Sequence, residues 1–173
     1  MKILVTYYSG TGNTEKIANA IKESIEGHEV DLLPVKKVDP DILSSYELVF
    51  LGSGTYAFNV NRKITSLVKK APHLPPKFAY FYTHESLTPW PKAFNSINHL
   101  ILKQNCEVLG EFDCCGENLV PKAQEQREAM YSRLSPEERK EAEEIYIKYV
   151  KGHPNKEDLE NAKKFAQSVI EKL

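Results

Sequence analysis

The chain has 173 residues, of which 41% are hydrophobic and 27% are charged, a composition typical of a globular protein that is long enough to bury a core. Its formal net charge of −1 excludes a nucleic-acid binder, and its short apolar runs exclude a membrane span. The missing signal segment after Met1 excludes a secretory leader, and three cysteines exclude a disulfide framework. We therefore expect a single domain, residues 1–173, in the cytoplasm, without nucleic acid or membrane partners.

Short apolar runs alternate with amphipathic segments along the first two thirds of the chain. The runs predict strands at residues 3–6, 30–33, 48–51, 78–82 and 108–112, and helices at 15–26, 61–70 and 88–102. In the first helix Ile17, Ile21 and Ile25 share one face, and Gly27 is expected to end it. This alternation predicts an α/β fold, a doubly wound five-stranded parallel sheet with the strand order 2-1-3-4-5.

Residues 116–152 break this alternation and predict a helical insertion after the fifth strand. One helix is expected at residues 121–133, and a second begins with a capping box at residues 135–138. Its apolar stripe consists of Ala142, Ile145, Tyr146, Tyr149 and Val150. We expect the stripe to be buried, either on the body of its own domain, which we favour, or as a homodimer contact. A last helix follows, capped by Asn155.

The loop between the first strand and the first helix reads Ser9, Gly10, Thr11, Gly12, Asn13 and Thr14. Its two glycines permit a tight turn and a close approach to a ligand, while the hydroxyl groups and the free N–H groups at the helix start can donate to an anion. The loop has no Lys or Arg, no nucleoside-triphosphate ending and no dinucleotide glycine spacing. It therefore suits a single terminal phosphate. The alternative is a Ser/Thr/Gly-rich turn with a capped helix.

This sextet, placed at the end of a first strand, resembles the phosphate loop of the flavodoxin family, which holds the phosphate of flavin mononucleotide (FMN). The resemblance covers residues 1–115 and the last helix, including residues 152–162, and leaves residues 116–152 unexplained. It implies FMN as the cofactor, held through its phosphate by residues 9–14.

Residues 52–59, after the third strand, resemble the family's loop that flanks the flavin ring. The resemblance assigns four of them to the cofactor: Thr55, Tyr56, Ala57 and Phe58. Aromatic side chains suit the flat faces of the ring, so Tyr56 is the first candidate neighbour and Phe58 the second. The alternative is that both aromatic residues are packed loop anchors.

The segment after the fourth strand is the third candidate, and the resemblance implies that it contacts the pyrimidine side of the ring. It contributes Thr83, His84, Glu85 and Trp90. His84 could respond to protonation of the ring, although a solvated loop histidine is the favoured interpretation. Trp90 could instead cover the start of the third helix.

The leading functional hypothesis is an FMN-binding electron-transfer protein with an unidentified redox partner protein, in which the flavin performs the chemistry. Electron carriers of the family are markedly acidic, whereas this chain is almost neutral, which leaves the partner open. One alternative is an FMN-dependent quinone reductase or other oxidoreductase, with a pocket shaped by the added helices. A second is a flavin-free scaffold, against which the intact loop argues. The five histidines lack metal-ligand spacing, so we expect no metal site.

Overall fold

The computed structural model describes residues 1–86 and 93–173. Within these residues, five strands form a parallel sheet in the order β2-β1-β3-β5-β6, which confirms the predicted doubly wound order. A short strand, β4, pairs antiparallel with the end of β3. The strands are β1 (Lys2–Tyr8), β2 (Glu29–Pro34), β3 (Leu48–Tyr56), β4 (Asn59–Val60), β5 (Lys77–His84) and β6 (Glu107–Cys115). The α-helices are α1 (Asn13–Glu23), α2 (Arg62–Lys70), α3 (Asn95–Lys103), α4 (Pro121–Tyr131), α5 (Pro136–Tyr149) and α6 (Lys156–Ile170).

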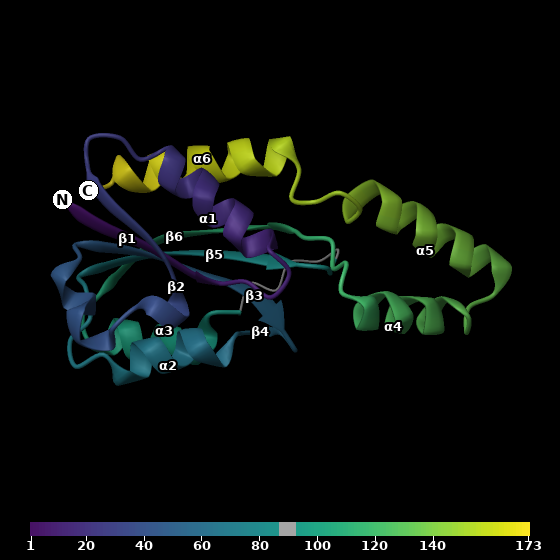
Figure 1. The fold of residues 1–173 in the computed structure, drawn as a ribbon, viewed down its shortest axis with the longest axis horizontal. Coiled ribbons are helices and arrows are strands. Elements are labelled where there is room, and N and C mark those ends of the chain that lie inside the picture. Colours follow the sequence, from purple (N-terminus) through teal and green to yellow (C-terminus); the bar gives the residue numbers. More distant parts are fainter. Residues whose placement is uncertain (87–92) are drawn as a thin grey trace.

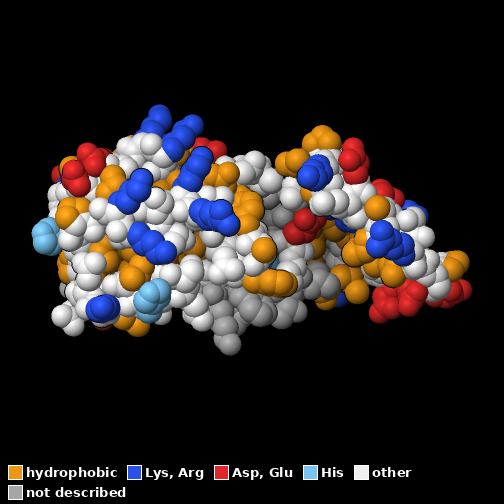
Figure 2. All heavy atoms as spheres, turned by 90° about the horizontal axis from the view of Figure 1, so that it is seen from below, with side chains coloured by type: hydrophobic (Ala, Val, Ile, Leu, Met, Phe, Trp, Pro, Cys, Tyr) orange, Lys and Arg blue, Asp and Glu red, His pale blue; other side chains and the backbone are white. Residues whose placement is uncertain are grey.

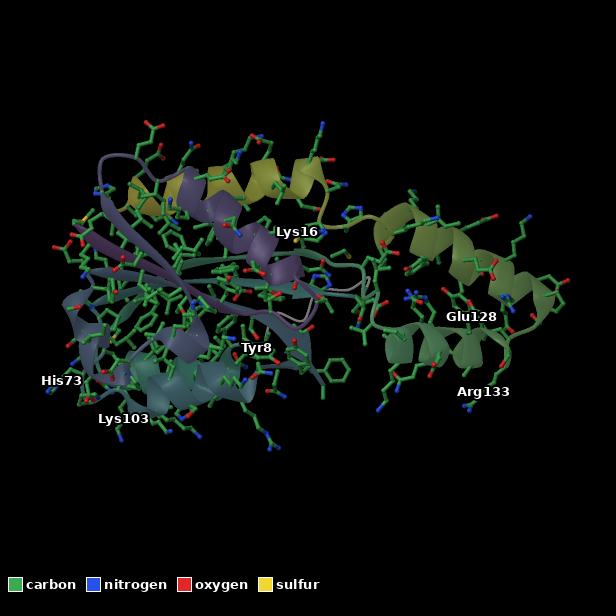
Figure 3. The ribbon with its side chains drawn as sticks, in the orientation of Figure 1. Tyr8, Lys16, His73, Lys103, Glu128 and Arg133 are labelled. Atoms are coloured by element: carbon green, nitrogen blue, oxygen red, sulfur yellow. The ribbon has the colours of Figure 1, made fainter. Side chains whose placement is uncertain are left out.

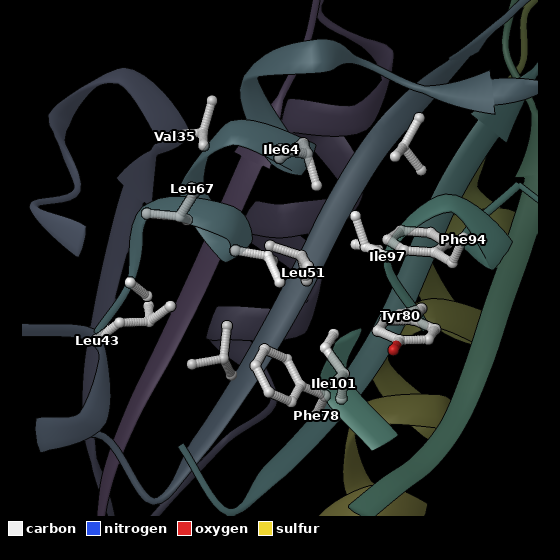
Figure 4. Close-up of a cluster of buried hydrophobic side chains, with 14 of the residues drawn as sticks. Val35, Leu43, Leu51, Ile64, Leu67, Phe78, Tyr80, Phe94, Ile97 and Ile101 are labelled. Atoms are coloured by element: carbon white, nitrogen blue, oxygen red, sulfur yellow. The ribbon is translucent and has the colours of Figure 1, made fainter. Parts of the chain in front are cut away.

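Helices cover both faces of the sheet: α1 and α6 lie on one face, and α2 and α3 on the other (Figure 1). On the first face Ile17 and Ile21 of α1 and Ile25 just after it are buried, as predicted, together with Ala162, Ala166 and Val169 of α6. On the second face α2, α3 and the 3-10 turns (Val35–Lys37 and Pro40–Ser45) enclose a second apolar cluster (Figure 4). Within the described part of the chain, no helix has the length and apolarity that crossing a membrane requires.

The five predicted strands all run further than their apolar runs indicated, and the longest extensions are in β3 and β6. β3 continues to Tyr56, so the expected glycine-rich loop at residues 52–54 is strand, because these residues pair with Phe81, Tyr82 and Thr83 of β5. β5 extends to His84 and β6 to Cys115. Ladder hydrogen bonds to neighbouring strands hold these polar extensions, and such bonds leave no apolar pattern in the sequence.

The first and third helices also differ from the prediction. α1 begins at Asn13, inside the candidate phosphate loop, and ends at Glu23 with Ser24 as its cap, so Gly27 does not terminate it. The expected start of the third helix at residues 88–92 lies outside the described residues. In α3 the predicted Ile97 and Ile101 are buried, but Leu102 is 53% exposed, because adjacent helical residues point about 100° apart.

The helices α4 and α5 form a hairpin that projects beyond the carboxyl edge of the sheet (Figure 1). The predicted capping box is present, with Ser135 and Glu138 bonding each other's backbone N–H groups. The prediction that the α5 stripe is buried, however, was wrong. Val150, just after α5, is 2% exposed, but Tyr149 is 46% exposed and no residue within α5 is buried. Docking on the domain body was also wrong, since α5 lies beside α4 instead (Figure 1).

Gly52 lies under the ring of Phe81 and provides a test of this packing. A Cβ atom at position 52 would come 2.1 Å from Cζ of Phe81, which is fully buried. We therefore expect Gly52→Ala to lower the free energy of unfolding in urea by about 1–3 kcal/mol, the usual cost of overpacking a core. Gly54→Ala in the same strand is the control, because its nearest atom is Tyr56 Oη at 3.3 Å. Equal losses in both variants would contradict this account.

Candidate functional site

The carboxyl ends of β1, β3 and β5 bring the three predicted segments together at one edge of the sheet. Thr14, in the first turn of α1, and Thr83, near the end of β5, are both buried, and their Oγ1 atoms lie 2.9 Å apart. Thr83 also pairs in register with Gly54 of β3. The candidate phosphate loop is therefore joined directly to the end of β5.

The loop after β1 has the geometry of an anion cradle. Gly12 takes a left-handed conformation (φ 89°) ahead of α1, and its N–H donates to Ser9 Oγ at 3.0 Å. The first helical bond runs from Lys16 N–H to Gly12 C=O, so the N–H groups of Asn13, Thr14 and Glu15 precede the helical ladder. Such groups and the positive end of the helix dipole attract an anion.

The hydroxyl groups of the loop keep donor capacity. Ser9 Oγ accepts from Gly12, so its own O–H is free to donate to a ligand. Thr11 is exposed at the tip of the loop. In the Thr14–Thr83 pair one hydroxyl donates to the other, which leaves one O–H for a further acceptor.

Tyr56 connects the second predicted segment to the first. Its hydroxyl accepts the backbone N–H of Gly10, and a Cβ atom at Gly10 would lie 2.8 Å from Tyr56 Oη. The ring of Tyr56 also meets that of Tyr8 edge-on, with centroids 5.8 Å apart; Figure 3 labels Tyr8 at this end of the sheet. Burial raises the pKa of Tyr56. A side chain at position 10 would therefore displace the hydroxyl end of Tyr56, whose side chain is 42% exposed.

Phe58 lies at the turn between β3 and β4. Positive φ angles at Ala57 (47°) and Phe58 (66°) reverse the chain, and Asn59 Nδ2 donates to Ala57 C=O. The side chain of Phe58 is 63% exposed, so the packed-anchor interpretation is wrong for this residue. Thr55 Oγ1 lies at hydrogen-bond distance, 3.5 Å, from Thr83 C=O.

His84 is buried at the end of β5, so the favoured interpretation as a solvated loop histidine was wrong. It is 7% exposed, its Nδ1 lies 2.7 Å from Ser86 C=O and its Nε2 lies 2.9 Å from Asp113 Oδ2. Burial alone would lower the pKa of His84, but the bonds to Asp113, Cys115 and Ser86 raise it to about 9. Both ring nitrogens therefore donate, and the residue is an imidazolium near neutral pH.

Glu85, the residue after β5, pairs with the helical hairpin. Arg127 Nη1 of α4 donates to Glu85 Oε1 at 2.7 Å. Burial raises the pKa of Glu85, although Arg127 opposes the shift. Trp90, the remaining candidate of this segment, lies outside the described residues.

Glu117 ties the base of the hairpin together. Its carboxylate accepts from Tyr146 Oη at 2.7 Å and from the N–H of Gly152 at 2.9 Å, and the bond from Tyr146 lowers its pKa. Its backbone C=O accepts from Asn13 Nδ2 at 2.8 Å. The hairpin is thus anchored to the start of α1. Sequence reasoning missed Glu117 and Arg127, because no local motif marks partners so distant in the chain.

These features fit a single phosphate monoester, held by neutral donors, better than a metal-bound ligand. The loop offers backbone N–H groups and neutral hydroxyls at a helix start. Within residues 1–86 and 93–173, no cluster of His, Cys, Asp and Glu could hold a metal ion. The individual contacts to FMN that the sequence suggests stay predictions.

Comparisons with known proteins agree with this geometry. The sequence pattern of the flavodoxin domain matches residues 4–167. The flavodoxin-like domain-containing protein BilS of Clostridioides difficile is 31% identical over 183 residues, covering 98% of this chain and 97% of that protein. Among solved structures, flavodoxin 2 of Bacillus cereus has a TM-score of 0.66 at 22% identity, with both chains fully covered. Rubredoxin oxygen:oxidoreductase of Desulfovibrio gigas has a TM-score of 0.63 at 16% identity, covering 99% of this chain and 35% of that one. The two structures share the fold.

The charge on His84 leads to a pH-dependent contribution to stability. Because its folded pKa of about 9 lies above its usual value of 6.5, the contribution is complete below pH 6.5 and is lost as the pH rises through 9. We expect His84→Gln to lower the free energy of unfolding by roughly 2 kcal/mol at pH 6, after solvent screening, and by much less at pH 10.

Urea unfolding of wild type and variant across this range measures the difference. His73→Gln is the matched control, since His73 is exposed and lies at the opposite end of the molecule (Figure 3). A deficit in the His84 variant that stays constant between pH 6 and 10 would remove the ion pair from the explanation.

Proposed function

Because this chain belongs to the flavodoxin domain family, we propose that it binds FMN at the carboxyl edge of its sheet and transfers electrons to or from a partner protein. The observation that carries the proposal is the cradle after β1, where Gly12 in its left-handed conformation leads into the open N–H groups of α1. Bound FMN would supply one- and two-electron redox chemistry. We further propose that residues 1–173 act as one domain in the cytoplasm, where thiols such as its three free cysteines stay reduced.

Each segment of the site has its own part in this proposal. Ser9, Thr11 and the Thr14–Thr83 hydroxyl pair would donate to the phosphate, and Tyr56 would cover or stack on the flavin ring. The His84 imidazolium holds the C=O of Ser86 and is paired with Asp113. Because Asp113 balances its charge, His84 mainly fixes the start of the segment after β5 rather than adding net charge beside the ring.

The charge distribution bears on the partner. Residues 61–115 carry seven basic and four acidic side chains, and Lys and Arg spread over the body on the α2 and α3 side, while acidic groups gather at the far end of the hairpin (Figure 2). This chain therefore lacks the uniformly acidic surface that would steer a carrier to basic partners.

A second candidate function is an FMN-dependent oxidoreductase, for example a quinone reductase. The fold also occurs in oxidoreductases, and a cavity between α4 and α5 begins at Glu85, next to the cradle. The open N–H groups of the cradle disfavour a flavin-free scaffold. A purified protein that is colourless and does not retain the absorbance of added FMN would support the scaffold instead.

Ligand choice tests the cradle. FMN should bind far more tightly than riboflavin, because the loop recognises the phosphate. Thr11→Ala should weaken FMN binding by about tenfold or more, the value of a hydrogen bond to a charged group, and should leave riboflavin binding unchanged. Isothermal calorimetry measures both, with Thr65→Ala on α2 as the control. Equal affinity for the two flavins would mean that the loop is not a phosphate site.

Turnover separates the carrier from the enzyme. If the FMN-bound protein is a carrier, its steady-state oxidation of reduced nicotinamide with a quinone as acceptor should be negligible, because a carrier exchanges electrons with a protein partner. Rapid turnover that saturates with both small molecules would favour the oxidoreductase. Absorbance at the nicotinamide band follows the reaction, with free FMN at equal concentration as the blank.

A further inference from the structure

The side of the body that carries α2 and α3 has a basic surface. The 3-10 turn at Val35–Lys37 and these two helices contain no Asp or Glu, and Figure 2 shows Lys and Arg over this side of the molecule. Their basic side chains are all exposed: Lys36, Lys37, Arg62, Lys63, Lys69, Lys70 and Lys103. The chain is almost neutral as a whole, so its charge is unevenly distributed.

Two of these cations stand where a helix disfavours them. Arg62 and Lys63 lie in the first turn of α2, at the positive end of its dipole, and that turn has no acidic residue. By contrast, α5 and α6 each begin with two acidic residues. Among residues 1–86 and 93–173, neither Arg62 nor Lys63 forms an ion pair. Helix stability therefore does not account for these two side chains.

The same cations border the candidate cofactor site. Lys63 Nζ lies 5.3 Å from the centroid of the Tyr8 ring. Lys36 and Lys63 line one hollow of about 270 Å³ together with Ser9 of the candidate phosphate loop. The acidic side chain that lines this hollow, Glu15, accepts a hydrogen bond from a tyrosine hydroxyl. We call Lys36, Arg62 and Lys63 the basic rim, because they lie beside the cradle.

Exposed aromatic side chains precede the basic rim. Tyr56 is 42% exposed and Phe58 is 63% exposed, and the turn that contains Phe58 leads through β4 into α2. Asn61, which caps α2, is held to the third strand because its N–H donates to Ser53 Oγ at 2.9 Å. Aromatic groups beside charged groups are the usual composition of a protein–protein interface, with its apolar centre and polar rim.

The size of the basic surface favours an acidic protein over a larger polyanion. Acidic side chains outnumber basic ones in residues 1–60, and acidic groups gather at the far end of the hairpin (Figure 2). A long nucleic acid or a flat anionic membrane would extend from the basic surface onto these repulsive groups. A small protein domain can contact the basic rim alone.

We propose that the basic rim is part of the docking surface for the redox partner protein, and that this partner presents an acidic surface. That the occupant is a redox partner rests on the proposed function. Opposite charges raise the rate of encounter and fix the orientation of the partner, so that its redox centre faces the carboxyl edge of the sheet. This is the reverse of the charge that an acidic carrier presents.

Charge reversal at the two ends of α2 tests the rim. The rim variant combines Arg62→Glu and Lys63→Glu, which place acidic residues at the start of the helix, where they favour folding. The matched control combines Lys69→Glu and Lys70→Glu, which make the same change in net charge at the other end of the same helix. Circular dichroism verifies that both variants are folded.

Binding is measured by isothermal calorimetry at low salt with two probes of opposite charge. The acidic probe is the soluble haem domain of cytochrome b5, and the basic probe is mitochondrial cytochrome c. We expect the full chain, with and without added FMN, to bind the acidic probe and not the basic one. The rim variant should bind the acidic probe about tenfold or more weakly, and the control should bind it as the wild type does. Added salt should weaken the binding.

Electron transfer provides a second, separate measurement. The FMN-bound chain is reduced with a stoichiometric amount of dithionite and mixed with the acidic probe. One electron passes from the reduced flavin to the haem iron, which changes from Fe³⁺ to Fe²⁺, and stopped-flow absorbance of the haem follows it. The rate should fall with salt and in the rim variant. Binding of the acidic probe without electron transfer would contradict the proposed function but not the acidic docking surface.

Four outcomes would overturn the proposal. The first is tighter binding of cytochrome c than of the acidic probe, and the second is an equal loss of binding in the two double variants. The third is tighter binding to phosphatidylserine vesicles or to a single-stranded oligonucleotide than to the acidic probe. The fourth is weaker FMN binding by the rim variant with unchanged binding of the acidic probe, which would assign the rim to the cofactor phosphate.

Discussion

The hydrogen bond between the Thr14 and Thr83 hydroxyls, 2.9 Å long and buried, joins the start of α1 to the end of β5. The rest of the candidate site depends on this junction. It fixes the position of the loop after β1 relative to the strand that continues into His84 and Glu85. Of the two hydroxyls, only one can donate to the other. Because an unpaired buried hydroxyl is costly, each threonine stabilises the position of its partner.

From this junction two further sets of contacts extend. The His84 imidazolium holds Ser86 C=O and Asp113, which ties the end of β5 to β6. Asn13 reaches the backbone of Glu117, whose carboxylate holds Tyr146 of α5. The hairpin is therefore connected to the same loop that would hold the cofactor phosphate. The base of the hairpin thus contacts Asn13 through Glu117 and Glu85 through Arg127.

Much of the fold could be predicted from local patterns. The isoleucine stripe of α1, the capping box at Ser135 and the strand order follow from periodicity and from short capping motifs, and the structure confirms them. The exposure of most of the α5 stripe could not be predicted in the same way. An apolar stripe indicates that a helix packs against an apolar neighbour, but it does not identify that neighbour. In this structure α4 covers only part of the α5 stripe.

The sequence by itself determined the order of strands and helices and the position of the candidate phosphate loop, because hydrogen bonds within a few residues and glycines at a turn leave a local trace. Tertiary structure alone decided that β3 runs through the glycines to Tyr56, that His84 is a buried cation, and that residues 116–152 project as a hairpin. Each of these depends on partners far apart in the chain: Gly54 with Thr83, His84 with Asp113, and Asn13 with Glu117. Such pairs meet only when the sheet has assembled, so no spacing in the sequence records them.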